Sequence, residues 1–353
     1  MIPSDRPDPP RPDALQNVAS ELIDYDLPEE LIAQEPAPER SASRLLVLDR
    51  ASGRITHERF SDIERYLAPG DLLVVNDTRV IPARVRARRS GGGKAELLLL
   101  EAHADEAGTW QALLRPGKAG RVGNELVLEG DERVRVRFIG REQAAFTIVF
   151  LEEGRVLDRE RVHELLARIG ETPLPPYIRR AADERRRESD RERYQTVFAA
   201  RPGAAAAPTA GLHFTREILD RLASRGIERA SVTLHVGIDT FRPIGEEELR
   251  TGRLHGERVE IDFENGEAIA RARREGRRIV AVGTTTVRAL ESFALAGKPL
   301  PYHARTRLFI RPGHAFQLVD AMVTNFHLPR SSLLLLVAAF AGRERVLAAY
   351  SEA

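Results

Sequence analysis

A change of pattern inside the chain constrains its fold more than any other feature of the sequence. Between about residues 83 and 152, short apolar segments alternate with glycine-containing turns, and no helical pattern lies between them. Within this stretch Val134, Val136 and Phe138 alternate with arginines, which is the period of a half-buried strand. Evenly spaced strands without intervening helices are typical of a small barrel. We therefore expect a small all-β barrel domain over residues 76–154.

The sequence on either side of this segment has a mixed α/β pattern. We expect a hairpin over residues 44–57 and, further along, strands and helices at these positions: strands at 72–75, 231–236 and 279–282; helices at 159–169, 265–274, 287–293 and from an N-cap at Thr215 to Gly226. This pattern predicts an α/β main domain, a mixed sheet with flanking helices, built from residues 15–75 plus 155–353. The barrel is then an insertion, and residues 1–14 form a disordered Pro-rich tail.

Composition excludes several classes of protein. The 353 residues include no cysteine, which removes disulfides, Cys-ligated zinc, iron–sulfur clusters and thiol nucleophiles. The 54 basic and 53 acidic residues nearly cancel, so bulk charge does not identify a nucleic-acid partner. The longest apolar run, residues 333–341, is well short of the roughly 20 residues that a membrane span needs. We expect a cytoplasmic monomer that does not associate with membranes.

Two polar clusters follow predicted secondary structure in the first two thirds of the chain. Asp77, Arg79 and Arg84 come after a buried strand, and guanidinium groups bind carboxylate or phosphate bidentately. A structural Asp–Arg pair at a domain junction is an equally good interpretation. The Ala/Gly-rich loop at residues 202–211 contains Thr209 and leads to His213, so it could bring backbone close to a ligand before a helix start. Alone, such a loop is often a mere connector.

Two further clusters place histidines and hydroxyls beside turns. The first contains the residues His235, Thr240, Arg242, His255 and Glu257. Loops that leave a rigid strand often carry function, although a lone histidine is more often structural. The second contains Thr284 and Thr285 at a predicted helix start with Arg288 one turn later, an arrangement that can cap the helix or bind an oxyanion. It lacks the Gly-Lys of a phosphate-binding loop and the G-x-G-x-x-G of a dinucleotide fold.

The stretch at residues 313–329 sets polar side chains among apolar ones. Asp320, Thr324, Asn325 and His327 precede the apolar run at 333–340. Each unpaired buried polar group costs about 1–3 kcal/mol, so these side chains must have partners, and a ligand is one possible partner. Together the clusters favour an enzyme.

Read in order, these clusters resemble the S-adenosylmethionine:tRNA ribosyltransferase-isomerase family of queuosine biosynthesis. The resemblance covers about residues 24–349, and its stretches are residues 43–47, 69–73, 76–84, 174–178, 194–197, 207–214, 235–237, 240–243, 282–288 and 324–329. The chain departs from the family pattern at Arg307, Arg311 and Ile238-Asp239. It also ends at Ala353, where family members usually continue through an aromatic segment.

The resemblance implies a fold, a reaction and partners. The fold is an α/β main domain interrupted by a small β-barrel. S-adenosylmethionine donates its ribosyl group, as a co-substrate and without a metal, to the aminomethyl group of 7-aminomethyl-7-deazaguanine at the tRNA wobble position. The products are epoxyqueuosine in tRNA, adenine and methionine.

This chemistry needs groups that transfer protons and groups that bind anions. We expect proton transfer from a pool that contains His213, His235, Glu257, His327 and Asp77. We expect substrate binding by Arg79, Arg84, Thr209, Thr240, Arg242, Thr284, Thr285, Arg288 and Asn325. The arginines at 179, 180 and 185–187 could contact tRNA, although a solvated helix face is the more favoured interpretation.

Two other classes stay open at this point. One is a catalytically lapsed relative that acts as an RNA-binding module. The other is a metallohydrolase with His213, His235, His255 and His327 as metal ligands. This class is less favoured because no H-E-x-x-H or similar close spacing is present.

Overall fold

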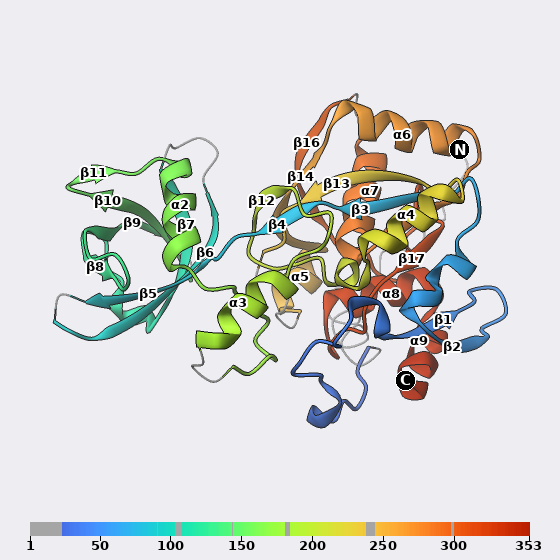
Figure 1. Cartoon of the computed structure of the whole chain (residues 1–353), viewed down its shortest axis with the longest axis horizontal. Coiled ribbons are helices and arrows are strands. Elements are labelled where there is room, and N and C mark those ends of the chain that lie inside the picture. Colours follow the sequence, from blue (N-terminus) through green and yellow to red (C-terminus); the bar gives the residue numbers. More distant parts are fainter. Residues whose placement is uncertain are drawn as a thin grey trace, which may run out of the picture.

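The computed structural model of the chain describes residues 23–89, 91–102, 108–142, 144–180, 184–237, 244–297 and 300–353. It has a mixed α/β architecture of sheets with flanking helices, which confirms that part of the sequence prediction. Two large sheets lie side by side, each with its own helices, and the chain passes between them near β4 and β12 (Figure 1). The tail expected at residues 1–14 lies outside the described residues.

The central sheet has six strands. Their order is β16 (Tyr302–Leu308), β14 (Arg253–Ile261), β13 (Glu228–Leu234), β3 (Leu72–Asn76), β15 (Ile279–Val282) and β17 (Ala321–Val323). The four strands from β13 to β17 run parallel, whereas β14 and β16 join antiparallel at one edge. The expected strands at 72–75 and 279–282 are therefore confirmed as neighbouring parallel strands inside this sheet.

Helices cover both faces of the central sheet, because its parallel strands are apolar on both sides. Leu72 and Val74 of β3 belong to a core with α6 (Phe263–Arg274), α7 (Thr284–Ala296) and α8 (Ser332–Ala341). Leu73 and Val75 pack on the other side in a core that includes α4 and the 3₁₀ helix η3; these span Arg216–Ser224 and Phe60–Tyr66. Thr215 caps α4 by accepting a hydrogen bond from the backbone N–H of Ile218, as the sequence predicted.

The second sheet is all antiparallel and has seven strands. These are β5 (Arg84–Arg89), β6 (Lys94–Ala102), β7 (Thr109–Arg115), β8 (Glu125–Leu128), β9 (Val134–Glu142), β10 (Ala145–Glu152) and β11 (Arg155–Val156). Strand order is β11-β10-β7-β6-β5-β8-β9, and β10 also pairs with β9, so the pairing of six strands returns to its start. The alternation expected in β9 is confirmed, and α2 (Arg159–Ile169) closes this core with Val162, Leu165 and Leu166.

Shorter elements complete the chain. The predicted hairpin is confirmed as β1 (Arg44–Leu48) and β2 (Ile55–Arg59). Strands β4 (Thr78–Val80) and β12 (Arg201–Ala204) pair parallel between the two large sheets (Figure 1). The remaining helices are α3 (Glu184–Arg193), α5 (Glu246–Thr251), α9 (Arg343–Glu352) and the 3₁₀ turns η1 (Glu29–Leu31), η2 (Arg40–Ala42), η4 (Gly117–Ala119) and η5 (Thr209–His213). None of the helices described combines the length and apolarity needed to cross a bilayer.

A buried carboxylate on α7 fixes the segment that leads into β17. The side chain of Glu291 is fully buried and accepts backbone hydrogen bonds from Gln317 at 2.8 Å, Leu318 at 3.0 Å and Val319 at 3.1 Å. These bonds satisfy three N–H groups that would otherwise be unpaired. They hold in place the chain that continues to Asn325 and His327.

Replacing Glu291 by alanine should therefore destabilise the fold. Each buried N–H group left without a partner costs about 1–3 kcal/mol, so we expect a loss of at least that amount in the free energy of unfolding. Urea denaturation followed by circular dichroism measures it. Glu188→Ala, an exposed glutamate in α3, is the matched control and should change stability by less than about 0.5 kcal/mol. Equal stability of the two variants would contradict this role.

Candidate functional site

A cavity of about 250 Å³ lies where four separated segments meet, and Tyr177 and Val236 from two other segments complete its lining. The segments are the N-terminal stretch around η1, the small-residue loop before η5, the start of α7 and the chain that follows β17. The lining residues are Tyr25, Leu27, Leu31, Ile32, Tyr177, Ala207, Pro208, Thr209, Ala210, Val236, Gly283, Thr284, Thr285, Thr324, Asn325, Phe326, His327, Leu328, Pro329, Ser331 and Leu333. Among the predicted site residues, five line this cavity: Thr209, Thr284, Thr285, Asn325 and His327.

The start of α7 forms one wall of the cavity. Gly283 precedes the helix with φ of 91°, a conformation that favours glycine, and no side chain caps the helix. The first backbone N–H groups of a helix lack intrahelical partners and carry its positive dipole end. Because Gly283, Thr284 and Thr285 line the cavity, this wall is suited to a negatively charged group.

Asn76, at the end of β3, fixes Thr285 beneath the cavity. Its buried amide donates to the Leu234 carbonyl at 3.0 Å and to Thr285 Oγ1 at 3.1 Å. Its Oδ1 accepts from the backbone N–H groups of Leu234 and Thr78. The side chain thus acts as one more peptide group in the sheet, joining β3, β13 and α7.

His327 is held at the cavity wall by its backbone and its ring. Tyr25 donates a hydrogen bond to the His327 carbonyl at 2.6 Å, and the Tyr350 hydroxyl accepts from the His327 N–H at 3.0 Å. The ring Nε2 lies 3.1 Å from Thr324 Oγ1. Burial lowers the pKa of His327 to about 4, so the imidazole is neutral at pH 7.

His213 lies one side chain away from the cavity. Its Nε2 is 3.1 Å from Asn325 Oδ1, and its Nδ1 is 3.1 Å from Ser43 Oγ. Burial lowers the pKa of His213 as well, so this ring also stays neutral at pH 7. His213 therefore reaches the cavity only through Asn325, whose amide it orients.

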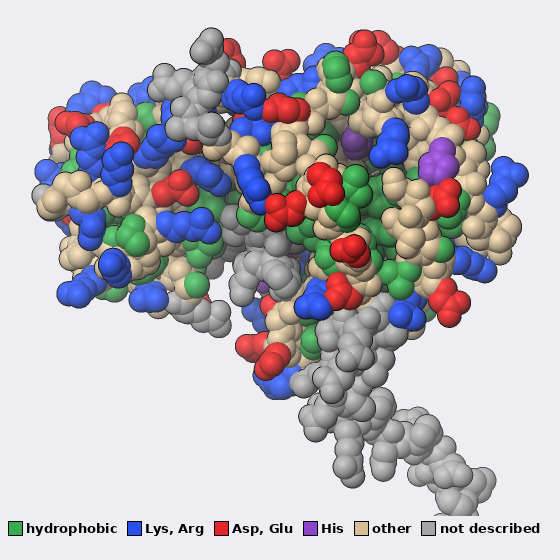
Figure 2. Space-filling view, turned by 90° about the horizontal axis from the view of Figure 1, so that it is seen from below, with side chains coloured by type: hydrophobic (Ala, Val, Ile, Leu, Met, Phe, Trp, Pro, Cys, Tyr) green, Lys and Arg blue, Asp and Glu red, His purple; other side chains and the backbone are tan. Residues whose placement is uncertain are grey.

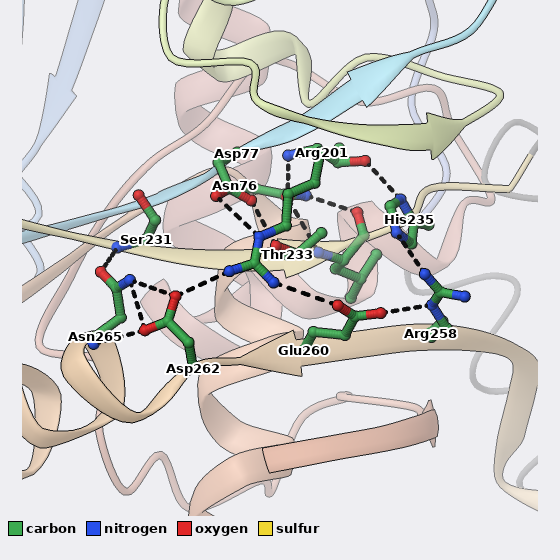
Figure 3. Close-up of polar contacts among 12 residues, drawn as sticks. Asn76, Asp77, Arg201, Ser231, Thr233, His235, Arg258, Glu260, Asp262 and Asn265 are labelled. Carbon is green, nitrogen blue, oxygen red and sulfur yellow. Dashed lines mark hydrogen bonds and ion pairs between the residues drawn. The ribbon is translucent and has the colours of Figure 1, made fainter. Parts of the chain in front are cut away.

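Asp77 and His235 belong to a charged network outside the cavity lining (Figure 3). Asp77 accepts a hydrogen bond from Thr233 at 2.6 Å and lies 3.8 Å from Arg201, and burial raises its pKa. His235 contacts Thr78 at 2.9 Å and Arg258 at 3.4 Å. Burial, followed by the charge of Arg258, lowers the pKa of His235 to about 4.

Arg201 is the centre of this network, since it also binds Glu260 at 3.3 Å and Asp262 at 2.9 Å (Figure 3). It therefore ties β12 to β14 and to the start of α6. The network touches the cavity indirectly, because Val236, next to His235, is a lining residue.

Glu257 and Arg288 form a buried ion pair with each other away from the cavity. Burial alone would raise the pKa of Glu257, but the charge of Arg288 and a hydrogen bond from His255 outweigh it and lower the pKa to about 2. The carboxylate therefore stays ionised and paired. Arg288 also donates to the Leu308 carbonyl at 3.2 Å. The pair joins β14 to α7, and neither residue is part of the cavity lining.

The other predicted anion-binding residues also lie away from the cavity. Arg79 is exposed on β4, and Arg84 begins β5, with Glu96 at 3.9 Å. Thr240 and Arg242 lie outside the described residues. The four histidines considered as metal ligands do not converge. Within the described ranges, no group of three or more His, Asp or Glu side chains is arranged to hold a metal ion.

The arginines proposed to contact tRNA are largely paired within the protein. Arg179 binds Glu29 at 2.7 Å, Arg180 binds Asp190 at 2.9 Å, and Arg187 binds Glu171 at 2.9 Å. Arg186 pairs with Glu35. Figure 2 likewise shows basic side chains over the seven-stranded sheet interspersed with acidic ones. The pairs of Arg179 and Arg186 are exposed and therefore weak, so a phosphate could replace their carboxylate partners.

Three aromatic lining residues were absent from the predicted site: Tyr25, Tyr177 and Phe326. Tyr177 and Phe326 stand inside stretches that carry the family resemblance, so their place in those motifs was the available signal. No local pattern marks Tyr25, because only the tertiary fold brings it to His327.

The lowered pKa values of two histidines predict how the stability of the fold depends on pH. His235 and His327 have pKa values of about 4 in the folded chain, whereas an unfolded histidine titrates near 6.5. The unfolded chain therefore binds more protons in this window, and the free energy of unfolding should fall as the pH drops from about 6.5 to about 4.

Urea midpoints measured between pH 7.5 and pH 4.5 test this expectation. His327→Gln should show a shallower loss of stability than the unsubstituted chain. His303→Gln, on the exposed face of β16, is the control and should keep the full slope. An unchanged slope in His327→Gln would show that its ring does not stay neutral in the folded protein.

Comparisons with known proteins identify the family of the chain. The family model described as "Queuosine biosynthesis protein" matches residues 20–353. Proteins named S-adenosylmethionine:tRNA ribosyltransferase-isomerase from Anaeromyxobacter sp. (strain Fw109-5) and Carboxydothermus hydrogenoformans are 53% and 49% identical; the matches cover 94% and 93% of this chain, and 93% of each relative. The crystal structure of an S-adenosylmethionine tRNA ribosyltransferase from Thermotoga maritima aligns with a TM-score of 0.51 at 39% identity, over 94% of this chain and 93% of that one. The chain therefore belongs to the queuosine biosynthesis protein family, as the sequence motifs indicated.

Proposed function

We propose that the cavity between α7 and the chain after β17 is the reaction site of an S-adenosylmethionine:tRNA ribosyltransferase-isomerase. The enzyme transfers and isomerises the ribosyl group of S-adenosylmethionine onto a tRNA base and releases adenine and methionine. The acceptor in this proposal is 7-aminomethyl-7-deazaguanine at the wobble position, and the product is epoxyqueuosine in tRNA. One observation carries the assignment: five separate motif stretches of the family, at Tyr177, Thr209, Val236, Thr284 and Asn325, line the same cavity.

The cavity offers complementary surfaces to S-adenosylmethionine. The uncapped start of α7, with Thr284 and Thr285, suits the methionine carboxylate. Tyr25 and Tyr177 supply aromatic faces, which attract a sulfonium cation and can stack on adenine. The small side chains at residues 207 and 210 allow the ligand to approach the backbone. No metal takes part in this scheme.

His327 is the group that we assign to proton transfer. The sulfonium acidifies the adjacent ribosyl carbon, and a neutral imidazole can accept the proton that leaves it. The electron pair left on that carbon, C5′, then forms a C4′–C5′ double bond as the C4′–O4′ bond breaks. O4′ becomes the carbonyl oxygen of C1′, and adenine leaves C1′ with a proton. With a pKa of about 4, protonated His327 returns a proton readily to that leaving group. The substrate amine adds to C4′ and loses its own proton, which returns the electron pair to C5′. C5′ then bonds to the C1′ carbonyl carbon and closes a five-carbon ring. The oxyanion formed there attacks C5′, so the carbon–sulfur bond breaks, methionine leaves and the epoxide closes.

The remaining candidates take supporting roles in this proposal. His213 orients Asn325, which presents its amide to the ligand. Asp77 and His235 hold the strand ends behind the cavity through the Arg201 network (Figure 3). Arg79 and Arg84, at the junction of the two sheets, are placed where they could meet tRNA phosphates.

We also propose a domain division. The closed ring of six strand pairings supports a small barrel over residues 76–154, inserted between residues 15–75 and 155–353. The enzyme acts as a monomer on this view, and its tRNA substrate favours a cytoplasmic location.

Product analysis tests the reaction directly. The protein incubated with S-adenosylmethionine and tRNA that carries 7-aminomethyl-7-deazaguanine should release adenine and methionine in equal amounts. Nuclease digestion and mass spectrometry should find epoxyqueuosine in the tRNA. Guanine-bearing tRNA is the control and should give no modified nucleoside. Release of S-adenosylhomocysteine in place of adenine would refute the ribosyl transfer.

Substitution of His327 tests its role. His327→Gln should lower kcat by about 10²–10⁴-fold, the usual effect of removing an acid–base group. The affinity for S-adenosylmethionine, measured by calorimetry, should change much less. His255→Gln is the control, since His255 pairs with Glu257 and does not line the cavity. Unchanged turnover in His327→Gln would remove this residue from the mechanism.

A further inference from the structure

Phe326 occupies an unusual position for a large apolar side chain. Among the residues that the structure describes, two phenylalanines are largely exposed: Phe263 at 62% and Phe326 at 52%. Phe263 begins α6 and does not line the cavity, whereas Phe326 does. Leu31, which is 70% exposed, lines the same cavity. The cavity wall therefore carries exposed apolar surface that no part of the described chain covers.

The Phe326 ring is held in place although it is exposed. It makes an edge-to-face contact with Tyr350, with centroids 4.8 Å apart and planes at 78°. Tyr350 contacts Tyr25 in the same manner at 5.1 Å. The next residue, His327, is fixed through its backbone by hydrogen bonds to these two tyrosine hydroxyls. The aromatic contact uses part of the ring, and the remaining surface is open to a ligand.

We propose that Phe326 is the stacking platform for the unstacked RNA base that accepts the ribosyl group. This inference rests on the proposed function and deepens it. An enzyme that modifies a base must take it out of its stack, and aromatic side chains then replace the lost stacking partners. A platform beside His327 places the base next to the ribosyl group. The base is flat and aromatic, and it therefore matches an exposed ring better than a charged side chain would.

The affinity for an RNA that is not modified measures the contact between Phe326 and the base separately from the reaction. The probes are a synthetic anticodon stem-loop RNA with guanine at the wobble position and the same RNA with an abasic wobble site. Base–aromatic stacking contributes about 1–3 kcal/mol, so Phe326→Ala should weaken binding of the intact RNA by about five- to 150-fold. Phe326→Trp should keep the affinity, and the matched control Phe263→Ala should bind like the unsubstituted protein.

The abasic RNA completes the comparison as a double-mutant cycle. The unsubstituted protein should bind it more weakly than the intact RNA by a factor similar to the Phe326→Ala loss. Phe326→Ala should bind both RNAs equally. If the affinity losses from Phe326→Ala and from removal of the wobble base multiply in the doubly changed complex, the ring and the base do not contact each other. That result would overturn the platform.

Two further results distinguish a failure of the stacking platform from a failure of the proposed function. If Phe326→Ala binds intact RNA normally while the unsubstituted protein still modifies tRNA, the platform is wrong and the proposed function stands. If instead the substitution dissolves a dimer in sedimentation experiments without changing RNA affinity, the ring serves self-association and the platform is equally wrong. A protein that modifies no tRNA would reject the proposed function itself, whichever RNA affinities are measured.

Discussion

The buried amide of Asn76 is the interaction on which the rest of the site depends. It pairs with both backbone groups of Leu234 and with Thr285 Oγ1, so it continues the sheet where β3 and β13 separate. Without it, three backbone groups and a hydroxyl would lose a partner in a buried place, at a cost of about 1–3 kcal/mol for each. Asn76 thereby holds Thr285, a residue of the cavity lining at the start of α7, to the ends of β3 and β13.

The cavity joins segments that are far apart in the sequence, and each is held by its own anchor. Glu291 fixes the chain before β17, and the hydroxyls of Tyr25 and Tyr350 fix His327. The Arg201 network ties the strand ends behind the cavity to the connection between the two sheets. The anchoring side chains do not take part in the reaction themselves. Together they keep the polar groups of the cavity wall in place before a ligand binds. Such preorganisation reduces the cost of arranging groups during the reaction.

Much of the fold could be predicted from local patterns. The alternation in β9, the apolar run of β3 and the Thr215 cap each depend on neighbouring residues, and each was found where the sequence placed it. Local patterns could not predict which polar side chains are buried or which residues they pair with. Glu257 was predicted from its cluster beside a turn and Arg288 from its place near a helix start, but their ion pair in the core joins residues that are 31 positions apart. Tyr25 had no signal at all, since only the folded chain brings it to the cavity. The motif order gave the correct family because it reflects the whole sequence and not one local environment.

The most direct test of the account is the position of the bound co-substrate. A crystal structure of the protein with S-adenosylmethionine should show the ligand in the cavity, with its carboxylate at the start of α7 and its sulfonium near the His327 ring. Ligand density beside Asp77, Arg201 and Glu260, with the cavity left unoccupied, would contradict the central claim.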